Sequence, residues 1–311
     1  MKKGVLLLNM GGPNNIDEVE MFLRNMFADR YILPMNSKSR KLVGSIIIKK
    51  RLQEAQENYR EIGGKSPLTE ITQGLCRKVE ALAGLPVLPA MRYVPPFAHE
   101  ALRDFQQQGI EEILLFPMYP QYSTTTTLSS VEDVEMQCAR LGYMPHIKIV
   151  EPYAIADGYI KIQVDGIMEA LGERDPEEYA LLLSAHGLPM RIVKAGDPYA
   201  NQVEANVYRI KEKLRQKGVR FSSVKLLYQS KVGGGVWLEP NLADVLRKPE
   251  ELKVLLYPLA FTIDNSETVF ELDIEHRQIA QKIGYRDYLL AKCPNDSDAF
   301  AEFIDAQISA L

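Results

Sequence analysis

The stretch Ala180-Leu181-Leu182-Leu183-Ser184-Ala185-His186-Gly187 is an apolar run that stops at a histidine and a glycine. An uninterrupted run of this length, without polar residues in alternation, predicts a strand buried on both faces. The predicted strand spans Ala180 to Ala185. Runs of the same character are Val5 to Asn9, Val87 to Arg92, Glu112 to Pro117, Ile147 to Val150, Val224 to Gln229, Lys253 to Pro258 and Tyr288 to Ala291.

Longer amphipathic stretches separate these runs and predict helices. They include Ala98 to Gln108, Thr127 to Leu141, Tyr159 to Leu171, Val203 to Lys217 and Glu267 to Ile283. Strands that alternate with helices predict parallel sheets covered on both faces and joined by right-handed crossovers. The pattern runs twice along the chain, so the predicted fold class is α/β with two doubly wound domains.

The length of 311 residues exceeds what one hydrophobic core usually serves. We expect an N-terminal domain of residues 1–150 and a C-terminal domain of residues 151–297, with the switch near residues 151–157. The last helix, residues 298–311, could pack on either half, with the N-terminal domain as the working assignment. Ligands of such sheets bind beyond the C-terminal ends of the strands, where the candidate residues fall. A single cleft between the two domains is therefore expected.

The composition is that of an ordinary globular protein, with 46% hydrophobic and 25% charged residues. A net charge of −4 argues against a nucleic-acid surface, which would be basic. The cysteines at positions 76, 138 and 293 lack metal-type spacing, which indicates free thiols in a reducing compartment and no iron–sulfur centre. The first apolar run is too short for a signal peptide, and no stretch approaches the ~18 apolar residues of a spanning helix. We expect a cytoplasmic protein that touches a membrane at most through its surface.

Three glutamates stand four residues apart near the C-terminus, at Glu267, Glu271 and Glu275. On a helix this spacing lines them along one face. Like charges at this spacing cost an isolated helix roughly 0.2–0.5 kcal/mol per pair. Stability alone does not favour such a row, whereas a path for a divalent cation or for protons requires one.

His186 ends the apolar strand and precedes a glycine, which favours projection into a cleft. Imidazole is a common metal ligand and the natural proton acceptor near neutral pH. An isolated histidine is more often structural, but Glu267 follows another predicted strand of the same half, and the two together favour a site. Histidine with carboxylates and without cysteine suits Fe²⁺, Mn²⁺ or Co²⁺ held loosely. Ser184 lacks the Gly-x-Ser-x-Gly turn of a hydrolase, and residues 9–13 match neither a dinucleotide fingerprint nor a P-loop.

Residues 27–51 break the alternation with an apolar segment and then a basic amphipathic run that includes Arg51. Such a run predicts an interfacial helix, a lid over an apolar and anionic ligand, or a core-packing helix with a solvated basic face. Arg92 and Tyr93 follow a predicted strand and could meet a ligand carboxylate.

Two stretches near the end of another strand leave alternatives open. Trp237, the single tryptophan, could line the cleft or fill the core. The glycines at 233–235, after Lys231, could form an anion-binding nest or a plain tight turn.

Several of these segments together resemble the ferrochelatase family, whose members insert Fe²⁺ into a porphyrin. The matching segments are Leu8-Asn9-Met10-Gly11-Gly12-Pro13, Tyr59-Arg60-Glu61-Ile62-Gly63-Gly64-Lys65-Ser66-Pro67-Leu68, Met91-Arg92-Tyr93, Tyr119-Pro120-Gln121-Tyr122-Ser123, Ser184-Ala185-His186-Gly187-Leu188-Pro189-Met190, Gly196-Asp197-Pro198-Tyr199, Tyr228-Gln229-Ser230-Lys231-Val232-Gly233, Trp237-Leu238-Glu239-Pro240 and Phe261 through Glu275. They occur in family order over nearly the whole chain.

The resemblance implies two chelatase-like domains with four-stranded parallel sheets and a porphyrin cleft between them. It implies that His186 and Glu267 are the catalytic pair and bind the metal, and that Glu271 and Glu275 form an acidic path leading away. Residues 27–51 correspond to an apolar lip that lies on the bilayer in membrane-associated members. The residues that it places at the porphyrin are Met10, Arg51, Tyr59, Ser66, Arg92, Tyr93, Trp237 and Phe261.

The chain also departs from the family pattern. Asn265 stands where many members have histidine, and the cysteine-bearing extension of iron–sulfur members is missing. Iron is therefore expected as a substrate, without a tightly bound cofactor.

The resemblance predicts a ferrochelatase of haem biosynthesis, with protoporphyrin IX favoured by the Met10 position and the long lip. Coproporphyrin III ferrochelatase, a cobalt or nickel chelatase of another tetrapyrrole pathway, and a haem-binding protein without turnover are the alternatives. The partners expected are a porphyrin, Fe²⁺ and a membrane surface at the lip, and no nucleic acid.

Overall fold

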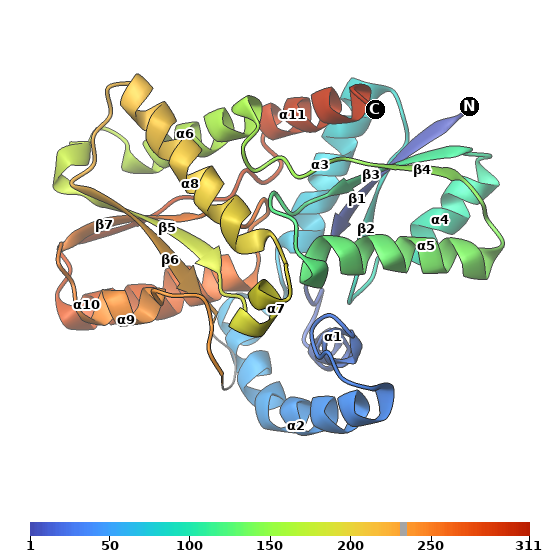
Figure 1. The fold of residues 1–311 in the computed structure, drawn as a ribbon, viewed down its shortest axis with the longest axis horizontal. Coiled ribbons are helices and arrows are strands. Elements are labelled where there is room, and N and C mark those ends of the chain that lie inside the picture. The colour runs from blue at the N-terminus through green and yellow to red at the C-terminus, as the bar shows by residue number, and fades with distance from the viewer. Residues whose placement is uncertain (231–234) are drawn as a thin grey trace. The chain divides into compact units, whose positions relative to one another are not determined.

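The computed structural model describes residues 1–230 and 235–311, so Lys231 and most of the glycine run, through Gly234, lie outside the described residues. The chain forms two compact units (Figure 1). Unit 1 comprises Met1–Tyr119, Ser123–Glu151 and Asp296–Leu311, and unit 2 comprises Pro120–Tyr122 and Pro152–Asn295.

Each unit contains a four-stranded parallel sheet, which confirms the predicted α/β fold class. In unit 1 the strand order is β2 (Val87–Met91), β1 (Lys3–Asn9), β3 (Glu112–Pro117) and β4 (His146–Ile149). In unit 2 the order is β6 (Ser223–Gln229), β5 (Ala180–His186), β7 (Lys253–Pro258) and β8 (Asp287–Leu290). The predicted strands agree with these bounds to within two residues, because buried strands read as continuous apolar runs.

The sheet of unit 1 has helices on both faces. They are α3 (Leu68–Ala83), α4 (Ala98–Gln107), the π-helix η1 (Thr124–Leu128), α5 (Ser129–Leu141) and α11 (Asp298–Ser309). Leu6 and Leu8 pack in one cluster with Phe105 of α4. On β3, Phe116 meets Phe300 of α11 edge-on, with ring centroids 6.5 Å apart. The C-terminal helix therefore belongs to unit 1.

The division differs from the expected one at the short segment 120–122. The carbonyl oxygen of Pro120 accepts hydrogen bonds from the backbone N–H groups of Tyr153 and Ala154, at 3.1 and 3.0 Å. The Gln121 side chain donates to Asn206 at 3.1 Å. These bonds place three residues from the middle of the first half in unit 2.

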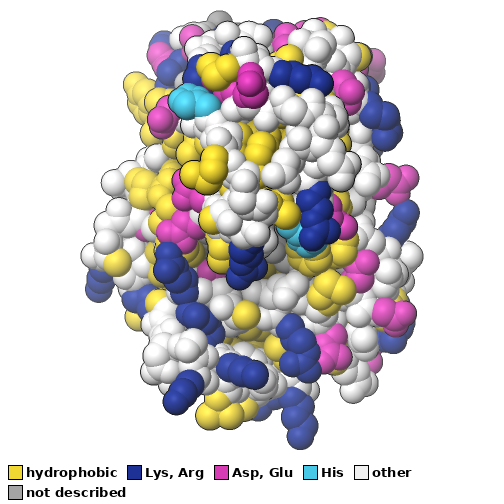
Figure 2. Space-filling model, turned by 90° about the vertical axis from the view of Figure 1, so that its right-hand side faces the viewer, with side chains coloured by type: hydrophobic (Ala, Val, Ile, Leu, Met, Phe, Trp, Pro, Cys, Tyr) yellow, Lys and Arg dark blue, Asp and Glu magenta, His cyan; other side chains and the backbone are white. Residues whose placement is uncertain are grey.

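The segment expected as a lip begins in α1 (Glu18–Ala28) and continues into the long helix α2 (Ser37–Glu61). Ile48 of α2 is buried in a cluster with Phe27 of α1. Leu42 and Ile46 of α2 are exposed. Figure 2 shows lysine and arginine side chains around a few apolar ones at the lower end of the view, where Figure 1 places α2. This helix thus has a core-packing face and a basic outer face that includes apolar residues.

In unit 2 the helices are α6 (Asp157–Leu171), the 3₁₀-helix η2 (Pro176–Glu178), α7 (Met190–Lys194), α8 (Tyr199–Gln216), α9 (Leu242–Arg247), the π-helix η3 (Glu267–His276) and α10 (Arg277–Ile283). Leu181 and Leu183 of β5 pack against α6 and α8. Leu182, which points to the other face, packs in a cluster with Leu272 of η3 and with α9 and α10. The fully buried Leu272 therefore fixes η3 on the sheet.

The helix predicted over residues 267–283 has a π-helical first part, η3, and only then becomes α-helical.

All three cysteines are buried and free, which confirms the expected free thiols. Over residues 1–230 and 235–311, we find no helix with both the length and the apolar character needed to cross a bilayer.

Candidate active site

The strand order of unit 2 brings three loop segments together at one edge of its sheet. β5 lies between β6 and β7, and His186 at its end is in register with Gln229 at the end of β6. The chain that leaves β7 leads through Phe261 to η3. Because carboxyl ends of parallel strands meet at one edge, residues far apart in sequence become neighbours there.

His186 is held by the backbone carbonyl of the next residue, Gly187, and by Glu267. Its Nδ1 donates to the carbonyl oxygen of Gly187 at 2.6 Å, since that oxygen can only accept. Nε2 then lies 3.6 Å from Oε1 of Glu267. The Phe261 ring packs edge-on against the imidazole, at 6.5 Å between centroids. The His186 side chain remains 38% exposed, so Nε2 can reach a substrate.

The carboxylates of Glu267 and Glu271 share a hydrogen-bonding residue, Ser230, directly after β6. The backbone N–H of Ser230 donates to Oε1 of Glu271 at 2.8 Å, and its hydroxyl donates to Oε2 of the same group. The Ser230 hydroxyl also lies 3.3 Å from Oε2 of Glu267. The Gln229 amide donates to Oε2 of Glu271 at 3.3 Å and accepts from the Ser184 hydroxyl at 2.7 Å. Glu271 is therefore fixed by three donors from the neighbouring strand end.

The side chain of Asn265, two residues before the π-helix, bonds to the backbone at its start. The side-chain oxygen of Asn265 accepts the backbone N–H of Glu267 at 2.8 Å, and its amide donates to the carbonyl oxygen of Ile263 at 3.0 Å. A π-helix bonds residues five apart, and such segments are frequent at functional sites. Glu275 lies in the last turn of η3 and is exposed, so it ends the row at the solvent.

The electrostatics of the cluster follow from burial and charge. Burial by itself would lower the pKa of His186, but the charge and hydrogen bond of Glu267 outweigh it and raise that pKa to about 9. Burial would raise the pKa of Glu267, yet the charge of His186 and its hydrogen bond lower it below the usual value. Burial, and then the charge of Glu267, raise the pKa of Glu271 to about 7. At neutral pH the pair is ionised, and Glu271 is close to half protonated.

Trp237 borders this cluster. Its backbone forms an isolated antiparallel β-bridge with Pro189, and a Cβ placed on Gly187 would lie 3.4 Å from the indole ring. Trp237 is partly exposed beside the segment that follows His186. Of the two expectations for Trp237, a position beside the site fits this geometry better than a core plug.

In unit 1, the segments after β1 and β2 meet at the carboxyl end of the sheet, where Tyr93 N donates to the carbonyl oxygen of Met10 at 3.0 Å and Arg92 N to that of Asn9 at 2.9 Å. The Arg92 guanidinium donates to the Ser129 hydroxyl at 3.0 Å and lies 3.5 Å from a carboxylate oxygen of Asp29. The Arg92 guanidinium therefore already forms an ion pair with a carboxylate of unit 1.

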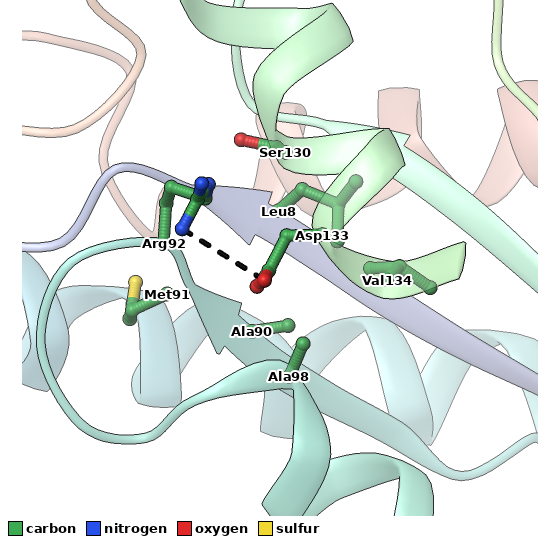
Figure 3. A pocket seen from close by; sticks show the side chains of 8 residues that line it. All are labelled: Leu8, Ala90, Met91, Arg92, Ala98, Ser130, Asp133 and Val134. Carbon is green, nitrogen blue, oxygen red and sulfur yellow. Dashed lines mark ion pairs between the residues drawn. The ribbon is translucent and has the colours of Figure 1, made fainter. Parts of the chain in front are cut away.

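Arg92 also borders a small pocket (Figure 3). The side chains that line it are Leu8, Ala90, Met91, Arg92, Ala98, Ser130, Asp133 and Val134. Asp133 and Arg92 point toward each other across it, at 3.8 Å between a carboxylate oxygen and Nη1. The pocket has no room for a water-sized sphere, so it cannot accept a macrocycle.

Tyr93, which the resemblance places at the porphyrin, is buried in unit 1. Its side chain is 1% exposed, and its hydroxyl donates to Asp29 at 2.8 Å. Burial, and then the charge of Asp29, raise the pKa of this hydroxyl well above its usual value. Its ring meets Phe22 of α1 edge-on, at 6.1 Å. Tyr93 therefore supports α1 and Arg92 from inside unit 1.

The remaining expected porphyrin contacts of unit 1 lie on α2 and after it. Arg51 is partly exposed on α2, and Tyr59 is buried in its last turn. Ser66 is buried and donates its backbone N–H to Pro13 at 2.8 Å. A Cβ on Gly12 would lie 2.5 Å from the Ser66 hydroxyl, so this close approach requires glycine.

Two residues beside the carboxylates carried no assigned role in the sequence. Gln229 and Ser230 stood in a family-like segment at a predicted strand end, which is the signal that could have identified them. Among the residues with described structure, no three histidine, cysteine, aspartate or glutamate side chains gather as a metal centre. His186 and Glu267 alone offer two ligands, fewer than a closed metal site has.

The sequence matches the ferrochelatase family model over residues 2–310. The chain belongs to the ferrochelatase family. A ferrochelatase of Wolinella succinogenes is 49% identical over 311 residues, which cover 99% of this chain and 98% of the relative. A ferrochelatase of Nitratiruptor sp. is 46% identical, with 96% and 97% covered, and one of Helicobacter pylori is 42% identical, with 100% and 94% covered.

Solved chelatases share the fold at low sequence identity. SirB from Bacillus subtilis, solved with Fe³⁺, superposes with a TM-score of 0.59 at 12% identity, covering 99% of this chain and 95% of SirB. CbiX, described as the terminal enzyme of sirohaem biosynthesis in denitrifying bacteria, gives 0.54 at 15% identity, with 78% and 91% covered. These likenesses establish the chelatase fold for this member of the ferrochelatase family.

Proposed function

We propose that the chain inserts Fe²⁺ into a porphyrin and releases two protons, as a lyase at the end of haem biosynthesis. Membership of the ferrochelatase family over nearly the whole chain supports this reaction. The observation that carries it to particular residues is the pair of His186 Nε2 and Glu267, 3.6 Å apart at a strand end and accessible to solvent.

Metallation removes two pyrrole N–H protons, so a base must stand beside the macrocycle. With a pKa of about 9, His186 holds a proton at neutral pH. It passes this proton to the carboxylates, accepts the first pyrrole proton and passes that one on in the same way before it accepts the second. Its Nδ1–H bond to Gly187 keeps Nε2 as the exchanging atom throughout.

The carboxylate row carries protons rather than iron in this proposal. Glu271, with a pKa of about 7, gains and loses a proton near neutral pH. A carboxyl must be ionised to bind a metal, so a half-protonated Glu271 is a weak ligand. Glu267 keeps its charge and is a ligand for the incoming Fe²⁺, whereas Nε2 of His186 can join it only after that nitrogen has lost its proton. Glu275 releases protons to the solvent at the end of the row.

Anaerobic turnover tests the reaction and the substrate. We expect many turnovers per chain with Fe²⁺ and protoporphyrin IX, and slower metallation of coproporphyrin III, measured as loss of free-porphyrin fluorescence. A preference for coproporphyrin would reverse the choice of substrate. Turnover only with Co²⁺ or Ni²⁺ and a different tetrapyrrole would favour the other chelatases. Binding of one equivalent of haem without turnover would replace the enzyme by a binding protein.

We also propose that no tightly bound cofactor takes part. The three cysteines are buried on separate elements, whereas a typical iron–sulfur cluster takes four cysteine ligands. Purified protein is expected to show full turnover and no charge-transfer absorption of a cluster. A visible cluster spectrum that tracks activity would contradict this.

A peripheral membrane contact through α2 is proposed for a cytoplasmic protein. Leu42 and Ile46 are exposed on α2, which also carries lysine and arginine. Apolar residues among basic ones bind anionic bilayers. Sedimentation with anionic vesicles should retain the chain and lose the Leu42→Ser/Ile46→Ser variant. Equal sedimentation of both would refute this contact.

A further inference from the structure

Ser230 occupies an unusual place for a serine. It follows β6 with a φ of +60°, in the left-handed region that a glycine adopts without strain. A side chain that is kept at such a position despite the strain points to a use for that side chain. The use visible here is its hydroxyl, which lies between two carboxylates.

The contacts of Ser230 connect both acids of the site. Its backbone N–H and hydroxyl both donate to Glu271, and the hydroxyl oxygen is 3.3 Å from Oε2 of Glu267. Two carboxylates this close repel each other unless a donor stands between them. Only the hydroxyl of Ser230 touches both of these carboxylates among the bonds of the described residues.

We infer that Ser230 is a positioning residue, whose hydroxyl holds Glu267 and Glu271 side by side so that Glu267 keeps its place beside His186. This inference rests on the proposed iron insertion. Ser230 touches neither the imidazole nor a substrate in this proposal. Its effect should therefore appear in kcat and leave the KM for porphyrin unchanged.

Two replacements separate the hydroxyl from the backbone strain. Ser230→Ala removes the hydroxyl and keeps the strain, whereas Ser230→Gly removes both. We expect kcat to fall about tenfold in both variants, the size of one lost hydrogen bond to a charged group. Thermal melts should show the glycine variant to be the more stable of the two.

Ser223, at the other end of β6, provides a matched control. Its hydroxyl donates to the carboxylate of Glu251 at 2.7 Å, so Ser223→Ala removes the same kind of bond far along the strand. We expect Ser223→Ala to retain wild-type kcat. A fall in kcat equal to that of the Ser230 variants would overturn the inference, since any serine–carboxylate bond would then suffice.

A double-mutant cycle tests the route through Glu271. Because Ser230 acts on the carboxylates, Ser230→Gly combined with Glu271→Gln should lower kcat less than the product of the two single effects. If the effects of Ser230→Gly and Glu271→Gln on kcat multiply in the double variant, the inference is overturned. It is also overturned if Ser230→Gly keeps the wild-type kcat while Ser230→Ala is slow, because backbone strain would then be the cause. Absence of turnover in the wild-type chain would instead refute the proposed function, so the two failures are distinguishable.

Discussion

Replacing Glu271 by glutamine tests whether the fold holds this carboxyl at an electrostatic cost. Burial and the charge of Glu267 raise the pKa of Glu271 to about 7. The folded chain therefore binds this proton more tightly than the unfolded chain does. Stability falls as the pH rises from the usual pKa of the group toward its folded value, and the full penalty is present above that value. Glutamine has nothing to ionise, so the variant escapes the penalty.

The size of the effect follows from the two pKa values. The usual value is 4.5 and the folded value about 7, and at about 1.4 kcal/mol per pKa unit the penalty at pH 8 is at most about 3 kcal/mol. Glutamine has one accepting oxygen where Glu271 has two, so it loses either the bond that Oε1 accepts from the Ser230 N–H or those that Oε2 accepts, which costs about 1 kcal/mol. We expect a net gain near zero at pH 5 and about 2 kcal/mol at pH 8.

Urea unfolding at a series of pH values measures this difference. Trp237 is the single tryptophan and lies in unit 2, so its fluorescence reports the unit that contains Glu271. Glu275→Gln is the matched control, because it removes an exposed glutamate from the same helix. We expect that control to follow the wild-type pH profile, and Glu271→Gln also to slow turnover.

The reasoning fails if wild type and Glu271→Gln lose stability in parallel between pH 5 and pH 8. It fails equally if Glu275→Gln shows the same gain, because the gain would then come from net charge and not from the buried position. His186 adds to the wild-type profile with the same sign. Its pKa is raised to about 9, so its stabilising contribution is complete below its usual value of 6.5 and is lost as the pH rises through about 9.

Three further outcomes follow from the structure. His186→Ala should lower iron insertion at least about a hundredfold, since the base is lost, while porphyrin binding followed by fluorescence quenching persists; near-normal turnover would remove the proposed base. Tyr93→Phe should cost about 1.5–3 kcal/mol in urea unfolding followed by circular dichroism, because Asp29 loses a donor, and an unchanged midpoint would show that this bond contributes nothing. Gly12→Ala should destabilise the fold by about 1–3 kcal/mol because its Cβ would collide with Ser66, and a stable variant would mean that the loop yields freely.

The bounds of the strands could be predicted closely because a strand buried on both faces reads as a continuous apolar run. The apolar run at residues 180–185 and the strand β5 differ by one residue. The ends of the strands also indicated the main candidate residues, because ligands of parallel sheets bind beyond those ends. His186 and Glu267 do come together, as their places after neighbouring strands indicated.

Other parts of the site depend on contacts that no local pattern encodes. The apolar spacing of residues 267–283 is that of an ordinary α-helix, and it does not reveal that η3 is π-helical or that the Asn265 side chain bonds to its first N–H. The role of Ser230 becomes visible only when the end of β6 lies beside the carboxylates of η3. Tyr93 directly follows a predicted strand, but its hydroxyl bonds to the distant Asp29, a pairing that no local pattern indicates.

The shared strand order of the two sheets has one more consequence. β1 and β5 hold the same place in their sheets, and each is seven residues long, so Asn9 is the counterpart of His186. The Asn9 amide turns back to accept the N–H of Met10 at 2.8 Å, and an amide cannot serve as a base. The same strand order therefore ends in a side chain that can act as a base in unit 2, His186, and in one that cannot in unit 1, Asn9.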